Sequence, residues 1–101
     1  MVRVRHYTRV SSLGRILAEG RIVASDQNKV FVERATRQAL APRDAERTYG
    51  LARGKGNAYV EFDIREDELE SQYNERMQLT ELFVRGDVVL VGREAQGYEN
   101  R

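Results

Sequence analysis

The chain has 101 residues, 41% of them hydrophobic and 33% charged, which favours one domain with a modest core. Its 17 Lys+Arg and 16 Asp+Glu give a formal net charge of +1, so charge alone calls for neither nucleic acid nor an anionic membrane. The lack of Cys excludes disulfides and thiol nucleophiles, and the lone His excludes a multi-histidine metal centre. No apolar stretch approaches the roughly 18 residues of a membrane span. We therefore expect a single domain over residues 1–101 that acts in a cytosol or is delivered there.

The first quarter of the chain predicts a strand followed by a helix. Apolar and basic residues alternate over residues 2–7, VRVRHY, as in a short strand. Residues 10–12, VSS, then open a helix, because a serine can accept the free amide hydrogen bonds at a helix start. Gly20 stands where a left-handed helix cap belongs. The apolar stripe of this helix consists of Leu13, Ile16 and Leu17.

The middle of the chain predicts a turn, a short strand and two helices. Residues 25–28, SDQN, have turn composition, and residues 30–32, VFV, favour a strand. Residues 35–40 favour a helix, and Pro42 either ends it or begins the next one. Residues 44–51 favour another helical turn or two.

The last part of the chain predicts three strands. Residues 58–64, AYVEFDI, alternate strongly, and a short turn follows at residues 67–69. Residues 79–84 predict a second strand, and a tight turn at residues 86–87 leads to a last one over residues 88–91. The order strand, helix, strand, helices and three strands indicates an α+β fold rather than alternating βαβ units.

Two residues stand out as candidates for chemistry. His6 is the only histidine, and it leads with Tyr7 and Thr8 into a helix start that offers a positive dipole to an anion. The alternative interpretation is that His6 is an ordinary residue at the end of a strand. Glu81 interrupts the apolar run LTELFV, and a carboxylate in a cleft can stabilise positive charge on a sugar ring. The alternative interpretation is that Glu81 is an outward-facing residue on an edge strand.

Two further acidic residues compete with Glu81. Glu61 and Asp63 share a strand face with Tyr59, and paired carboxylates can do acid–base chemistry. The alternative is the solvated face of a strand whose other face is apolar. Phe31 and Tyr49 are aromatic residues of ordinary core type.

In their order along the chain, these residues resemble the ADP-ribosyltransferase superfamily on its His-Tyr-Glu side. The likeness is greatest to small bacterial polymorphic-toxin transferases with a His-Tyr-Asp/Glu signature. Residues 6–8, HYT, are similar to the first-strand His-x-Ser/Thr motif, and the helix ending at Gly20 to the element that follows it. Residues 29–32 and Tyr49 are similar to the second motif strand and the second aromatic, and residues 80–84 to the late strand with the catalytic Glu. The resemblance spans about residues 3 to 94.

The resemblance implies an ADP-ribosyltransferase-like split β-sandwich of short strands with a few helices. NAD⁺ would bind as substrate between two small sheets, with no metal. Glu81 and His6 would be catalytic, Glu81 on the nicotinamide-ribose 2′-hydroxyl and the oxocarbenium-like state, and His6 on a ribose hydroxyl. The Tyr7 backbone would hold the nicotinamide amide, Thr8 the ribose or the amide, and Phe31 and Tyr49 would flank the nicotinamide ring. Phe31 stands where Tyr is usual, which removes a hydroxyl.

Several points stay open within this resemblance. An Asp signature would point to Asp63 instead of Glu81, and Arg5 and Arg34 are candidates for the pyrophosphate. The chain would be an NAD-dependent glycosyltransferase that modifies a protein or nucleic acid, or an NAD glycohydrolase. As a toxin it would be the C-terminal domain of a secreted or delivered effector that acts in the target-cell cytoplasm, with a cognate immunity protein as partner. The alternative from another class is a non-enzymatic module that binds RNA or protein through its arginines.

Overall fold

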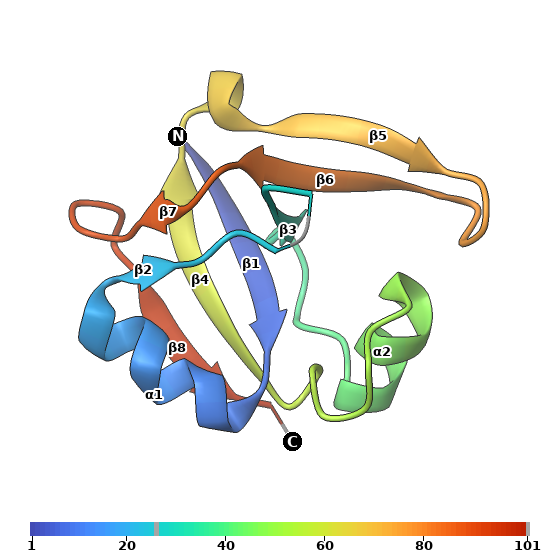
Figure 1. Ribbon diagram of the computed structural model, residues 1–101, viewed down its shortest axis with the longest axis horizontal. Coiled ribbons are helices and arrows are strands. Elements are labelled where there is room, and N and C mark those ends of the chain that lie inside the picture. The colour runs from blue at the N-terminus through green and yellow to red at the C-terminus, as the bar shows by residue number, and fades with distance from the viewer. Residues whose placement is uncertain (26, 101) are drawn as a thin grey trace.

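An antiparallel sheet organises the chain, and short helices pack beside it (Figure 1). The computed structural model describes residues 1–25 and 27–100; the predicted turn at 25–28 includes Asp26, which lies outside the described residues. The elements within the described residues are β1 (Val2–Thr8), α1 (Val10–Glu19), β2 (Arg21–Ile22), β3 (Lys29–Arg34), α2 (Pro42–Tyr49), β4 (Ala58–Ile64), a 3₁₀ turn (Glu66–Glu68), β5 (Glu70–Asn74), β6 (Leu79–Arg85), β7 (Val88–Val89) and β8 (Gln96–Glu99). This mixture confirms the predicted α+β class.

The main sheet has six strands in the order β5-β6-β3-β1-β4-β8, and β2 pairs with β7 in a separate ribbon. The central strand β1 pairs with β4 along its whole length, from Val2 opposite Ile64 to Thr8 opposite Ala58. Its pairing with β3 on the other side covers Val4 with Arg34 and Arg5 with Glu33. The sheet therefore divides beyond Arg5 into a β1-β4-β8 part and a β3-β6-β5 part, which is compatible with the expected split sandwich.

The hydrophobic core lies on the face of the sheet that α1 and the β2–β7 ribbon cover. Val60, Phe62 and Ile64 are fully buried, as the alternation of this strand predicted. Gly97 on β8 lets α1 come close, because a Cβ there would lie 2.7 Å from the Leu13 side chain. Apolar burial of this kind contributes about 25 cal/mol per Å² and holds α1 against the sheet.

The first helix confirms the predicted end but not the predicted start. Gly20 adopts φ 68° and donates its amide to the Ile16 carbonyl at 2.8 Å, as a left-handed cap does. The residue that caps the start is Arg9, which makes no side-chain capping bond, so the serines at 11–12 lie inside the helix. Leu17 is 46% exposed, so Leu13 and Ile16 supply the buried side of the stripe.

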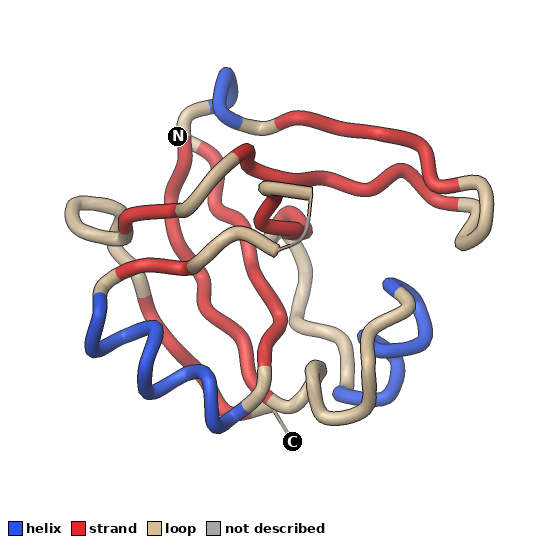
Figure 2. Tube along the Cα trace, viewed as in Figure 1, coloured by secondary structure: helices blue, strands red, loops and turns tan. Residues whose placement is uncertain are grey.

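The helix expected over residues 35–40 is absent, and Figure 2 shows a loop between β3 and α2. Tertiary partners take the backbone groups that a helix would have used. The Ala35 amide donates to the Arg3 carbonyl at 2.9 Å, and the Leu40 amide donates to the Tyr7 hydroxyl at 2.8 Å. The second helix begins at Pro42, one of the two roles expected of that residue, and it ends at Tyr49, two residues before the predicted end at residue 51.

Three strands were missing from the sequence prediction: the two-residue β2, which pairs with β7, and the strands β5 and β8, which lie at the two edges of the six-stranded sheet. β5 and β8 have the sequences ESQYN and QGYE, whose polar residues give no apolar alternation. The strand over 58–64 is confirmed, the one over 79–84 extends to Arg85, and the strand over 88–91 shortens to two residues. Among the described helices, none combines the length and apolar character of a membrane span.

Candidate active site

A cavity of about 450 Å³ opens where β1 and β3 separate, and we call it the cleft. The structure brings together at this cleft the residues expected at the NAD site: His6, Tyr7, Thr8, Phe31, Tyr49 and Glu81. They come from β1, β3, α2 and β6, so strands that are distant in sequence supply its walls. The cleft therefore gathers a histidine, several aromatic rings and a carboxylate in one concave site.

His6 occupies the point where the β1–β3 pairing ends. Its Nδ1 lies 2.7 Å from the Phe31 backbone oxygen, and because a carbonyl only accepts, Nδ1 carries the hydrogen. Burial lowers the pKa of His6 below 6.5, and the nearby charge of Lys55 lowers it further, against the opposing effect of the Phe31 hydrogen bond. The ring is therefore neutral at pH 7, and its Nε2 is a hydrogen-bond acceptor.

Glu33 joins three side chains around the base of the cleft. Its Oε2 accepts hydrogen bonds from the Tyr7 hydroxyl at 2.7 Å and from Arg5 Nη1 at 2.6 Å. Its Oε1 accepts a hydrogen bond from the Tyr49 hydroxyl. Glu33 was not among the residues singled out from the sequence. The signal that could have found it is its position two residues after Phe31, on the same face of β3.

The two tyrosines that contact Glu33 are held as hydrogen-bond donors. Burial and the Glu33 contact raise the pKa of Tyr7 to about 12, and the same causes raise the pKa of Tyr49. The rings lie 6.1 Å apart between centroids. Tyr7 is only 8% exposed, so its side chain forms part of the wall.

Glu81 is half-buried on β6 and receives both of its hydrogen bonds from amide side chains on β5. Gln72 Nε2 donates to Oε1 at 3.0 Å, and Asn74 Nδ2 donates to Oε2 at 3.1 Å. Within the described part of the chain, Glu81 makes no ion pair, whereas Glu33 pairs with Arg5. Glu33 and Glu81, two of the carboxylates that line the cleft, thus differ in their partners: the charge of Arg5 neutralises Glu33, whereas uncharged amides bind Glu81.

The competing acidic residues lie outside the cleft. Asp63 pairs with Arg3 at 3.1 Å, opposite it on the neighbouring strand. Glu61 pairs with Arg5 at 2.8 Å. Neither carboxylate lines the cavity. The structure therefore places both in ion pairs on the sheet face that lies opposite the core.

The two arginines considered for the pyrophosphate, Arg5 and Arg34, already form ion pairs with carboxylates of the domain. Arg34 pairs with Glu66 at 2.9 Å and does not line the cleft. Arg5 lines the cleft but is 3% exposed, and its guanidinium binds Glu33, Glu61 and the Arg37 carbonyl. Other cations line the cleft from the β1–α1 junction, α1, β2, β3 and the loop before β4: Arg9, Arg15, Arg21, Lys29 and Lys55.

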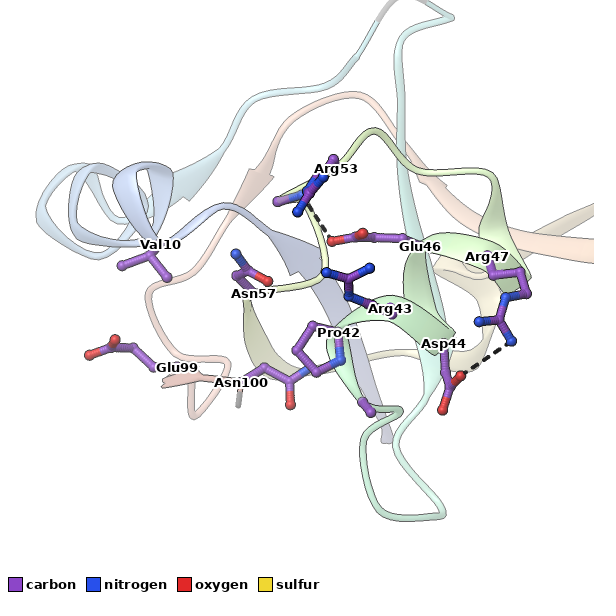
Figure 3. Close-up of a pocket in the computed structure, with 12 residues that line it drawn as sticks. Val10, Pro42, Arg43, Asp44, Glu46, Arg47, Arg53, Asn57, Glu99 and Asn100 are labelled. Carbon is purple, nitrogen blue, oxygen red and sulfur yellow. Dashed lines mark hydrogen bonds and ion pairs between the residues drawn. The ribbon is translucent and has the colours of Figure 1, made fainter.

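A second hollow of about 910 Å³ lies beside the start of α2, and Figure 3 shows its side chains. Its acidic groups have structural partners: Glu46 accepts the Gly54 and Gly56 amides at 2.9 and 3.1 Å, and Asp44 pairs with Arg47 at 3.6 Å. None of the residues expected at the NAD site lines this hollow. Nor do the described residues gather three His, Cys, Asp or Glu side chains around a common point for a metal. The cleft is therefore the candidate active site.

Comparison with known proteins gives the family of the chain but no site residue. Neither a curated protein nor a solved structure matches the chain. Residues 4–91 match a family of toxin domains that is described as "HYD1 signature containing ADP-ribosyltransferase". The matched range runs from β1 to beyond β7 and includes His6, Phe31, Tyr49 and Glu81. With most of its length covered by that family, the chain belongs to the ADP-ribosyltransferase toxin domains.

Proposed function

We propose that the domain uses NAD⁺ as its substrate, cleaves the nicotinamide–ribose bond and transfers ADP-ribose to a macromolecular acceptor. The observation that carries this proposal is the state of Glu81. Its two oxygens are fixed by Gln72 and Asn74, and no cation among the described residues neutralises it. When the bond breaks, its electrons leave with nicotinamide and positive charge develops on the ribose. A fixed, unneutralised carboxylate stabilises that charge.

The remaining residues of the cleft take the roles of binding and orientation. Neutral His6 accepts a hydrogen bond from a ribose hydroxyl through Nε2, and the Tyr7 backbone binds the nicotinamide amide. Thr8 contacts the ribose or the amide. The rings of Phe31 and Tyr49 flank the nicotinamide. An acceptor nucleophile then bonds to the ribose carbon and loses its proton to solvent.

For the pyrophosphate we propose the cations at the cleft wall instead of Arg5 and Arg34. Arg9 and Arg15 lie at the start of α1 and within it, and both line the cleft. Lys55 lies near enough to His6 to lower its pKa. Both arginine side chains are exposed enough to reach a phosphate, and a guanidinium suits phosphate oxygens better than an ammonium does.

As a member of a toxin family, the domain acts, we propose, as part of a delivered effector in the cytoplasm of a target cell. A cognate immunity protein that covers the cleft would block NAD⁺ entry. Residues 1–101 would form the single catalytic domain.

The deciding experiment incubates the purified domain with NAD⁺ and a cell lysate and measures free nicotinamide and ADP-ribose attached to macromolecules. We expect Glu81→Gln to lower nicotinamide release by at least about 100-fold, the usual loss when a group that stabilises transition-state charge is removed. His6→Ala should also lower it. The matched control is Asp63→Asn, which removes a carboxylate outside the cleft and should leave release within about twofold.

Each result of this experiment bears on a separate part of the proposal. Release without macromolecular label would make the domain an NAD glycohydrolase. A loss in Asp63→Asn with full activity in Glu81→Gln would transfer the catalytic role to Asp63. A folded wild-type domain that releases no nicotinamide would contradict NAD⁺ cleavage altogether, and steeply salt-dependent RNA binding would then favour a binding module.

A further inference from the structure

The edge strand β5 presents two amide side chains to the cleft-side carboxylate of β6. Gln72 pairs with Glu81 across the β5–β6 ladder, and Asn74 follows two residues later on the same face of β5. These are the side chains that bind the two oxygens of Glu81. Ser71 and Tyr73 alternate with them and are exposed on the other face.

Each amide is held in one orientation by a second partner. Lys29 Nζ donates to Gln72 Oε1 at 2.5 Å, so the nitrogen of Gln72 is the atom turned to Glu81. The Met77 backbone amide donates to Asn74 Oδ1 at 3.1 Å, which turns the nitrogen of Asn74 to Glu81 in the same way. A flipped amide would place an oxygen against a carboxylate oxygen and would lose its own second partner. Both donors are therefore fixed before any ligand binds.

This arrangement orients Glu81 without cancelling its charge. Lys29 is the cation of the network, and Gln72 stands between it and Glu81. A direct ion pair, like that of Arg5 with Glu33, would weaken the field that the carboxylate exerts on a nearby positive charge. Neutral donors fix the position of both oxygens and leave the negative charge in place.

We propose that Gln72 and Asn74 are positioning residues of the transferase reaction, which act by fixing the carboxylate of Glu81 toward the ribose. The inference rests on the proposed catalytic role of Glu81. Neither Gln72 nor Asn74 lines the cleft, so both act through Glu81 and not by contact with NAD⁺. Their loss should lower the rate of bond cleavage and leave the binding of NAD⁺ largely unchanged.

The test compares kcat and KM for nicotinamide release in variants of β5. We expect Gln72→Leu and Asn74→Leu to lower kcat by about 10- to 100-fold with KM within about twofold, as for a misplaced catalytic group. The near-isosteric Gln72→Glu and Asn74→Asp should lose more, because each puts a negative oxygen against Glu81. The matched control, Ser71→Leu, places the same leucine on the exposed face of β5 and should keep kcat within about twofold.

A second comparison asks whether the amides act through Glu81. In the Glu81→Gln background, Gln72→Leu should cause no further loss of the residual release rate, since the group that it positions is already gone. Independent, multiplicative losses would overturn the inference. A larger loss of kcat in the leucine variants than in the acidic variants would also overturn it. That order would show that the residues matter for packing and not for the charge next to Glu81.

Failure of this inference is distinguishable from failure of the proposed function. If Glu81→Gln abolishes release while all four variants of Gln72 and Asn74 keep wild-type kcat, Glu81 is catalytic and the positioning role is refuted. If wild type releases no nicotinamide, or Glu81→Gln releases it at the wild-type rate, the proposed function itself fails. A thermal melt of each variant excludes loss of the fold as the cause, and the near-isosteric pair keeps the test valid if a leucine variant unfolds.

Discussion

Replacing Glu33 by alanine should destabilise the fold more than the removal of any exposed carboxylate. The change removes the carboxylate that accepts hydrogen bonds from three donors: the Tyr7 hydroxyl, the Tyr49 hydroxyl and the Arg5 guanidinium. A buried donor that loses its partner costs about 1–3 kcal/mol, and breaking a buried ion pair costs about 3–5 kcal/mol. Arg5 keeps its ion pair with Glu61, and half-buried Tyr49 can bind water. The total loss of stability should therefore be about 3 kcal/mol, the lower end of the range for a broken buried ion pair.

We therefore expect Glu33→Ala to lower the free energy of unfolding by about 3 kcal/mol. For a domain of this size that corresponds to a fall in Tm of roughly 12–24 °C. Urea denaturation followed by circular dichroism gives the free energy, and a thermal melt gives Tm. The matched control is Glu66→Ala, which removes an ion pair with Arg34 at the exposed surface and should leave both midpoints unchanged. A Glu33→Ala midpoint equal to that of wild type would refute the argument from buried donors.

Gly14→Ala should raise the free energy of unfolding by about 0.5–1 kcal/mol in a urea titration, because a Cβ there meets nothing within 4 Å; destabilisation would contradict this. Arg93 lowers the pKa of Glu68 from 4.5 to about 2, so the pair stabilises the fold above pH 4.5 and loses that effect as the pH falls toward 2. In an acid titration, the free energy of unfolding of Glu68→Gln should therefore fall less steeply over this range than that of wild type. The single imidazole signal of His6 should titrate below pH 6.5 by NMR, and a midpoint at or above 6.5 would contradict its burial.

Local sequence patterns predicted those elements whose cause is local. Alternation over residues 58–64 and the glycine at position 20 each depend on neighbouring residues alone, and both are confirmed. The helix expected at 35–40 failed because its backbone groups bind Arg3 and Tyr7, which are distant in sequence. A propensity scale contains no such partner.

The candidate site was accessible to sequence reasoning only in part. His6 and Glu81 were identified by residue type and by resemblance, and the structure brings both to the cleft. Glu33 was missed because its importance depends on the register that sets it opposite Arg5, 28 positions earlier in the chain. Gln72 was missed for a related reason: β5 is polar, and its pairing with β6 was not expected.

The division of the sheet beyond Arg5 has a mechanical consequence for the cleft. His6 belongs to one branch of the sheet and Glu81 to the other, and the branches meet at the pairing of Arg5 with Glu33. The Glu33 contacts lie at that junction, so they set how far apart the branches stand at their base. A dinucleotide that touches both branches meets a spacing that folding has already fixed, and little of its binding energy goes into ordering the site. The width of the cleft is therefore set by contacts at the junction of the two branches and not by contacts at its open end.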